Sequence, residues 1–105
     1  MRLFLSLGML GVLAVASVAW AGTQAVDQKN LRFSASSLTV ARDHLIEFDN
    51  SDDTWHNVTI VGDGLMLSSG LQAPGEPFKV RLGKPGVYNV TCGLHPKMKM
   101  TVVVD

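Results

Sequence analysis

Three side chains near the C-terminal end of the chain could bind one metal ion together. Cys92, His95 and Met98 offer a thiolate, an imidazole and a thioether at three-residue spacing. A loop that joins two strands can curl around an ion and present all three donors to it. A further donor must come from elsewhere in the fold, and His56 lies where the loop 50–55 enters a predicted strand. We therefore predict that these four residues form a metal site.

The donor types favour copper. Cysteine and methionine sulfurs are soft ligands that favour Cu(I), and imidazoles accept copper in either oxidation state. Two histidines and a cysteine in a trigonal arrangement, with a distant methionine on the axis, are typical of a blue-copper electron-transfer site. Zinc is the alternative, but zinc seldom binds a thioether. Covalent haem attachment would need a Cys-x-x-Cys-His motif, which the sequence lacks.

Each donor has a simpler interpretation when it is considered alone. Cys92 or Met98 could be an ordinary core residue, and a single histidine is more often a surface residue or a hydrogen-bonded core residue than a ligand. The combination of the three-residue spacing, the upstream histidine and the strand-loop-strand context is more specific than any one of these residues. We therefore prefer the metal site.

Short β-strands are predicted to position the donors. Apolar and polar residues alternate in 78–82 and 88–92, which is the period of a strand with one buried face. Turn-forming residues separate such stretches, and no helical period follows residue 21. The predicted strands are 31–33, 38–41, 45–48, 58–61, 78–82, 87–92 and 101–104, whereas 22–30 is polar and has no strand pattern. The pattern predicts an all-β fold, either a β-sandwich or a small Greek-key barrel, and of these we expect a Greek-key β-sandwich of about seven to eight strands.

The composition describes one small globular domain. The chain has 105 residues, of which 47% are hydrophobic, and its formal net charge is zero. A nucleic-acid-binding domain would need a basic surface, and a disordered chain would have a lower apolar content. We therefore expect no nucleic-acid partner.

Residues 1–21 have the composition of a secretory signal peptide. They contain 16 apolar side chains and one charge, at Arg2, and they end in Ala-Trp-Ala, with small residues at both key positions of a cleavage site. A transmembrane anchor is the alternative, but the uncharged run 3–18 is slightly short for a full span. We predict cleavage after Ala21. The mature domain 22–105 would be exported to the periplasm without stable membrane association.

Export makes the single cysteine informative. Small exported domains usually gain stability from disulfides, but Cys92 has no partner for an internal one. A free thiol in an oxidising compartment is a liability unless it is buried or bound to a metal. A ligand role for Cys92 accounts for both observations.

The sequence resembles the cupredoxins, the small type 1 copper proteins of the plastocyanin and amicyanin group. The resemblance covers about residues 31–105. Its motifs are Phe-Asp-Asn at 48–50, His-Asn-Val at 56–58, Ala-Pro-Gly-Glu at 73–76, Pro-Gly-Val-Tyr at 85–88 and Cys-Gly-Leu-His-Pro-Lys-Met at 92–98. The short spacing of the last motif is similar to that of amicyanin. The resemblance implies that residues 22–105 form a cupredoxin domain.

The resemblance also implies a role for each ligand. His56, Cys92 and His95 form the trigonal plane around one type 1 copper ion, and Met98 is the axial ligand. Asn50 matches a family asparagine that holds the loop of the first histidine against the cysteine loop. Such a residue is useful because hydrogen bonds outside the ligand set orient the ligands and tune the metal.

We predict an electron carrier that cycles between Cu(I) and Cu(II). By resemblance, the electron passes through His95, and transient redox partners dock on an apolar surface beside it, for which Leu94 and Pro96 are the local candidates. We expect a monomer. A protein that stores or delivers copper is the alternative, because Met66 and Met100 would offer further sulfur if either lies near the site.

An enzyme is not expected. A copper enzyme with a type 1 site needs a second copper ion or an open substrate position, and the chain has three histidines in all. The third, His44, opens a predicted strand and is expected to be solvated. Lys97 and Lys99 flank the ligand loop and are expected to be surface residues that could form a basic rim.

Overall fold

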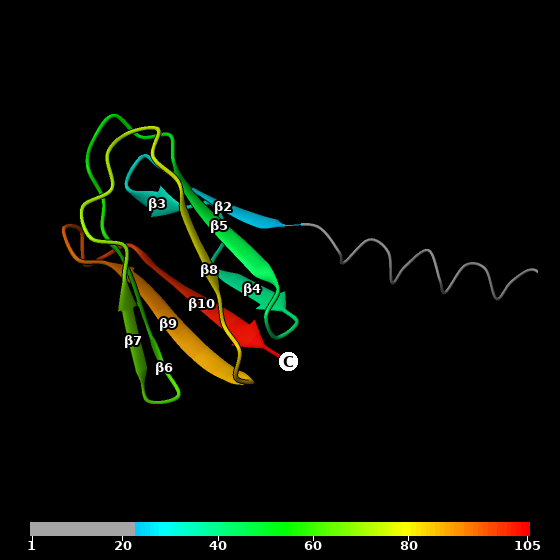
Figure 1. Cartoon of the computed structure of the whole chain (residues 1–105). Coiled ribbons are helices and arrows are strands. Elements are labelled where there is room, and N and C mark those ends of the chain that lie inside the picture. The colour runs from blue at the N-terminus through cyan, green and yellow to red at the C-terminus, as the bar shows by residue number, and fades with distance from the viewer. Residues whose placement is uncertain (1–22) are drawn as a thin grey trace, which may run out of the picture.

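The structure, a computed structural model, describes residues 23–105 (Figure 1). The predicted signal peptide 1–21 and its cleavage site lie outside the described residues. Within 23–105 the chain forms nine strands and no helix. They are β2 (Gln24–Lys29), β3 (Arg32–Phe33), β4 (Ser37–Val40), β5 (Leu45–Asn50), β6 (Val58–Gly62), β7 (Leu65–Ser68), β8 (Phe78–Arg81), β9 (Gly86–Cys92) and β10 (Lys99–Val104). Among these residues, no helix has the length and apolar character that crossing a membrane requires.

The strands form two sheets that pack as a sandwich. The five-stranded sheet has the order β4-β10-β9-β6-β7, and the four-stranded sheet has the order β3-β2-β5-β8. The β4–β10 and β2–β5 pairs are parallel, and the other pairs are antiparallel. Strands far apart in the sequence, such as β6 and β9, are therefore neighbours, as in a Greek-key sandwich. The predicted all-β sandwich is confirmed.

Two of the strands, β2 and β7, were not predicted from the sequence. The segment 22–30 was expected to contain no strand, but β2 forms there and pairs with β5. Its inward-facing residues are Val26 and Gln28, so a polar residue interrupts the apolar period. β7 is an edge strand whose side chains are mostly exposed, and a strand without a buried face has no reason to alternate.

The core combines inward-facing residues of both sheets. Phe48 of β5 lies at its centre, with Phe33 against it edge-on at 6.4 Å and Phe78 stacked at 6.3 Å between ring centroids. The inward face of β9 ends at Cys92, which is fully buried. Because Cys92 pairs with Val58 of β6 in the middle of the sheet, its sulfur is held by regular strand structure.

The long loops gather at one end of the sandwich. Figure 1 shows the loops that follow β5, β7 and β9 at the upper left, whereas the β6–β7 hairpin and the C-terminus lie toward the other end. The predicted ligands come from the first and third of these loops and from the end of β9. The fold therefore brings distant parts of the sequence together at this end.

Tyr88 should make the stability of the fold sensitive to alkaline pH. Its ring is buried and its hydroxyl donates a hydrogen bond to the Lys84 carbonyl at 2.8 Å. Burial, with a smaller effect from Asp63, raises the pKa of the phenol above its ordinary value of 10.0. A pKa that is higher in the folded than in the unfolded state gives stability that is present below pH ~10 and is lost as pH rises through the folded value.

Urea unfolding at pH 8 and at pH 11 would test this prediction with wild type and Tyr88→Phe. We expect the wild type to lose more stability than the variant between the two pH values. Lysine titration affects both proteins alike, so the difference between them reports on Tyr88. An equal loss in both proteins would show that the alkaline sensitivity comes from other groups.

Candidate metal centre

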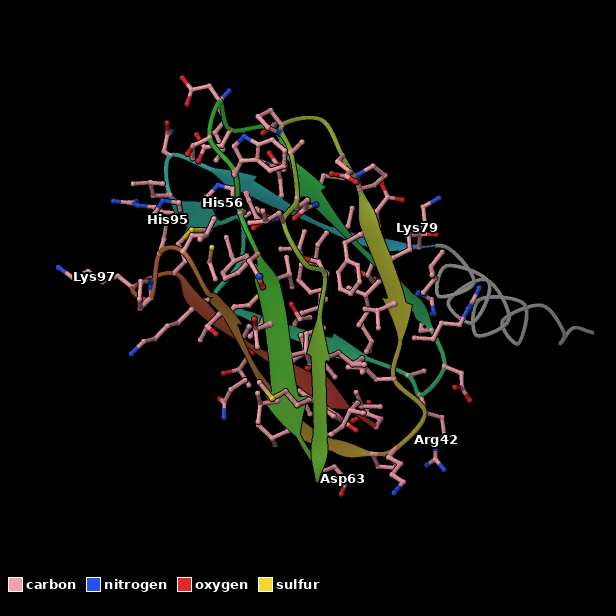
Figure 2. The ribbon with its side chains drawn as sticks, turned by 60° about the vertical axis from the view of Figure 1, so that its left-hand side comes forward. Arg42, His56, Asp63, Lys79, His95 and Lys97 are labelled. Atoms are coloured by element: carbon pink, nitrogen blue, oxygen red, sulfur yellow. The ribbon has the colours of Figure 1, made fainter. Side chains whose placement is uncertain are left out.

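Three of the four predicted ligands bring their donor atoms together. The Nδ1 atoms of His56 and His95 each lie 3.6 Å from Cys92 Sγ, and all three donor atoms lie within 4.8 Å of one another. The two imidazole rings are 5.0 Å apart and inclined at 67°. Figure 2 shows both histidines at the same end of the sandwich.

These distances fit a shared metal ion. First-row metal bonds of about 2.0–2.1 Å to nitrogen and about 2.3 Å to sulfur place two donors of one ion about 3.5–3.8 Å apart. The observed 3.6 Å separations fall in this range. A thiol has only one proton, so it can donate to only one of the two Nδ1 atoms. An ion bound by all three atoms accounts for both distances, and the sulfur and imidazole donors suit copper.

Cys92 and His56 are held together by the residue that follows His56. The Asn57 backbone N–H points at Cys92 Sγ, with the nitrogen 3.3 Å from the sulfur. The Asn57 carbonyl accepts a hydrogen bond from Gly93 N at 3.0 Å, which fixes the start of the cysteine loop. Both contacts join the segment that carries His56 to the end of β9 and so hold the Cys92 sulfur beside the His56 ring.

His56 is fixed from both its backbone and its ring. Its backbone forms a two-way bridge with Gln72, with hydrogen bonds of 3.1 and 2.8 Å. The imidazole is fully buried, and Nε2 lies 3.0 Å from Asp52 Oδ2. The hydrogen bond from the Leu31 backbone N–H, followed by the one from His56, holds the pKa of the Asp52 carboxyl below its ordinary value. Asp52 is therefore a carboxylate at neutral pH.

The cysteine loop consists of two successive turns. The His95 N–H donates to the Cys92 carbonyl at 3.2 Å, and the Met98 N–H donates to the His95 carbonyl at 2.9 Å. The three-residue spacing of the donors follows from these turns. Met98 is buried at the end of the loop, whereas His95 is half-buried between the exposed residues Leu94 and Pro96.

Comparison with known proteins identifies the family. A family model described as copper binding proteins, plastocyanin/azurin family, matches residues 21–105. The chain belongs to this family. This cupredoxin is 33% identical over 90 residues to the plastocyanins of Ulva pertusa and Ulva arasakii, and each match covers 75% of the chain and 92% of the plastocyanin. The resemblance of the sequence to the cupredoxins is thereby confirmed, and copper is assigned to the site.

Solved structures share the fold of this cupredoxin. The reduced Cu(I) form of an amicyanin variant at pH 4 matches with a TM-score of 0.74 and 23% identity, over 80% of this chain and 83% of amicyanin. A Cu-containing nitrite reductase from Thermus scotoductus SA-01 matches with a TM-score of 0.73 and 23% identity. That match covers 80% of this chain but 22% of the reductase. Both comparisons concern the fold alone.

One sequence-based role in this cupredoxin needs correction. Asn50 does hold the loop of the first histidine, because its Nδ2 donates to the Thr54 carbonyl at 3.0 Å. Its second bond, at 3.1 Å, goes to the Gln72 carbonyl rather than to the cysteine loop. Asn50 ends a strand of the four-stranded sheet and faces the loop after β7, whereas Asn57 meets the cysteine loop. The prediction that Asn50 contacts the cysteine loop is therefore wrong.

Gln72 supports the site and was missed. It is buried, and its Nε2 donates to the carbonyls of Phe48 and Glu76 at 2.9 and 2.5 Å. Its Oε1 accepts a bond from Gln28 Nε2 at 2.8 Å. The residue thus ties the loop after β7 to the four-stranded sheet at the point where the loop bridges His56. A single glutamine in a loop gives no sequence signal of this role.

The structure also places the two further methionines and the third histidine that the sequence analysis considered. Met66 is exposed on β7 and pairs with Val61, so it lies along the sheet away from the ligands. Met100 is buried in the core opposite Val90, the next inward-facing residue before Cys92 on β9. His44 is half-buried with its Nε2 shielded from solvent, so the expectation that it is solvated is wrong.

Proposed function

We propose that this cupredoxin carries single electrons between redox partners by cycling one type 1 copper ion between Cu(I) and Cu(II). His56, Cys92 and His95 would hold the ion, with Met98 as the fourth donor. The convergence of one sulfur and two Nδ1 atoms at 3.6 Å carries the proposal. Copper supplies the electron, and the protein supplies the geometry and the low dielectric around it.

Hydrogen bonds that do not depend on copper support fast electron transfer. The Asn57 N–H holds the Cys92 sulfur, and the Gln72 bridge holds the His56 backbone. A site whose ligands are held in one geometry changes little when the metal changes charge. Little rearrangement means a small barrier to electron transfer.

We propose a carrier rather than an enzyme. Within 23–105, one group of three or more His, Cys, Asp or Glu side chains is placed to hold a metal, and it is the site itself. A type 1 copper enzyme needs a second copper ion or an open substrate position. The nitrite reductase with a similar fold is a far longer chain, of which this protein matches about a fifth.

Stopped-flow mixing with a soluble cytochrome c would test the carrier function. We expect the copper-loaded protein to exchange one electron per chain with the cytochrome and to keep its copper afterwards. Loss of copper to an apo acceptor without electron exchange would favour copper delivery instead. The delivery alternative now has weaker support, because Met66 lies away from the site.

A docking surface for redox partners surrounds His95. Leu94 and Pro96 are exposed on either side of it, and Trp55 and Leu71, from the neighbouring loops, are half-exposed or more. An exposed apolar surface beside a redox centre suits weak, short-lived complexes. We propose that transient redox partners bind at this surface.

We also propose that the carrier is a monomer and that it has no stable membrane association after cleavage of residues 1–21. The signal peptide directs the mature domain 22–105 to the periplasm.

Lys97 and Lys99 should steer an acidic partner to this surface. Both are exposed, and Figure 2 shows Lys97 projecting from the end of the molecule that carries His95. Surface charges accelerate association less as salt screens them. We expect Lys97→Ala to slow association with an acidic redox partner about two- to fivefold at low salt, and to reduce the salt dependence of the rate.

Lys79→Ala is the matched control, because Lys79 is an exposed lysine of β8, well away from His95 in Figure 2. Stopped-flow rates measured from low to high ionic strength would compare the three proteins. Equal salt slopes for wild type and Lys97→Ala would remove Lys97 from the docking surface.

A further inference from the structure

Asp52 lies behind the first copper ligand and contacts it directly. The residue is in the loop between β5 and β6, and its carboxylate is 10% exposed. Oδ2 is 3.0 Å from His56 Nε2 and also accepts the backbone N–H of Leu31 at 3.0 Å. The Asp52 backbone N–H donates to Asn50 Oδ1 at 3.0 Å. The carboxylate is therefore fixed in position.

This contact determines which ring nitrogen of His56 carries the proton. A carboxylate can only accept a hydrogen bond, so Nε2 is the donor, and Nδ1 of the neutral ring keeps its lone pair. Nδ1 is the atom that faces Cys92 Sγ. A metal-bound histidine whose other nitrogen donates to a carboxylate has a fixed tautomer and ring orientation, and its ligand nitrogen is more basic.

The two histidines of the site differ in burial and in contact with a carboxylate. His56 is fully buried beside a carboxylate, whereas His95 is half-buried. Within residues 23–105, His56 is the histidine whose ring lies within ion-pair distance of a carboxylate. A negative charge near a buried ligand interacts more strongly with Cu(II) than with Cu(I), because Cu(II) has the larger charge.

We propose that Asp52 is a positioning residue that fixes the Nε2–H tautomer of His56 and lowers the reduction potential of the bound copper. The inference rests on the proposed function, since it concerns the copper that the ligands hold. It goes beyond that function because Asp52 contacts a ligand and is not itself a ligand.

Asp52 also holds the turn between β2 and β3. Asn30 and Leu31 both have left-handed backbone conformations, with φ of 54° and 59°, which are unfavourable for residues with a Cβ. The bond from Leu31 N to Asp52 Oδ2 helps to secure this turn. D52A would therefore disturb the turn as well as the histidine, so a variant that changes charge alone is needed.

The test uses three variants of the mature protein. D52N keeps an oxygen that can accept from His56 and Leu31 but removes the charge, and D52A removes both. D53N removes a charge from the neighbouring, exposed aspartate and is the matched control. Competition with chelators gives the Cu(I) and Cu(II) affinities without requiring electron transfer, and ¹⁵N NMR of the copper-free protein gives the tautomer of His56.

We expect D52N to raise the ratio of Cu(I) to Cu(II) affinity about tenfold, which is equivalent to ~59 mV in potential. D53N should leave the ratio within about twofold of wild type, because its charge is exposed to solvent. In copper-free protein, His56 should be the Nε2–H tautomer in wild type and D53N and a mixture of tautomers in D52A.

Two results would overturn the inference. If D52N and D53N have the same affinity ratio, the charge of Asp52 does not tune the copper. If the tautomer of His56 is unchanged in D52A, the carboxylate does not set it, and any loss of thermal stability reflects the turn alone. Failure of the proposed function looks different: the wild type would bind copper without exchanging electrons, and the affinity ratios and NMR spectra would still decide the role of Asp52.

Discussion

Cys92→Ser should abolish the intense thiolate-to-Cu(II) absorption of the copper-loaded protein. The absorption requires a sulfur bound to Cu(II), and Cys92 Sγ is the atom to which both imidazole Nδ1 atoms are directed. A serine hydroxyl is a hard donor that stays protonated at neutral pH. We expect copper affinity to fall by more than the roughly 10–100-fold that changes outside the ligand set produce. Absorption spectra and chelator competition would measure both effects.

The fold should tolerate this change, because the Asn57 N–H can donate to the serine oxygen as it does to the sulfur. Met66→Leu is the control, since it removes a sulfur from an exposed position on β7. It should leave the colour and the copper affinity unchanged. A coloured Cys92→Ser protein would contradict the assignment of Cys92 as the ligand.

Gln72→Leu should produce a large loss of stability. The side chain of Gln72 donates hydrogen bonds to the carbonyls of Phe48 and Glu76 and accepts one from the amide of Gln28. Leucine has a similar volume but pairs with none of them, and each buried group left unpaired costs about 1–3 kcal/mol. Gln28 keeps its bond to the Asp49 carbonyl, so we expect a total loss of about 2–5 kcal/mol in the free energy of unfolding. Urea unfolding of the copper-free protein would measure it.

The matched control is Gln24→Leu in β2. Gln24 is half-buried, and its side chain makes no hydrogen bond to another of the residues that the structure describes. A surface-type substitution of this kind usually changes stability by about 0.5 kcal/mol or less. Equal stabilities of the two variants would show that the Gln72 network contributes little.

Strands in which apolar and polar residues alternate could be predicted from the sequence, because the alternation shows which face is buried. The alternation in 88–92 predicted β9, with Cys92 as its last residue and on its buried face, and the structure agrees. The ligand loop was predictable because its donors lie three residues apart on one loop. Two successive turns, which end at His95 and Met98, determine where this loop places the three donor residues.

Contacts between distant segments could not be predicted in the same way. Asp52 reaches His56 and Leu31, but an aspartate in a polar loop looks like any solvated turn residue. Asn50 and Asn57 are both asparagines near the first histidine, and only the packing of the loops shows which one meets the cysteine loop. Hydrogen-bond partners of this kind depend on tertiary structure, which local periodicity does not encode.

A redox titration of the copper-loaded protein, followed by its visible absorption, tests the central claim most directly. The account predicts that the colour is lost on addition of one electron per chain and returns fully on oxidation, with the copper retained throughout. A colourless Cu(II) complex, or a protein that releases its copper on reduction, would contradict the electron-carrier function.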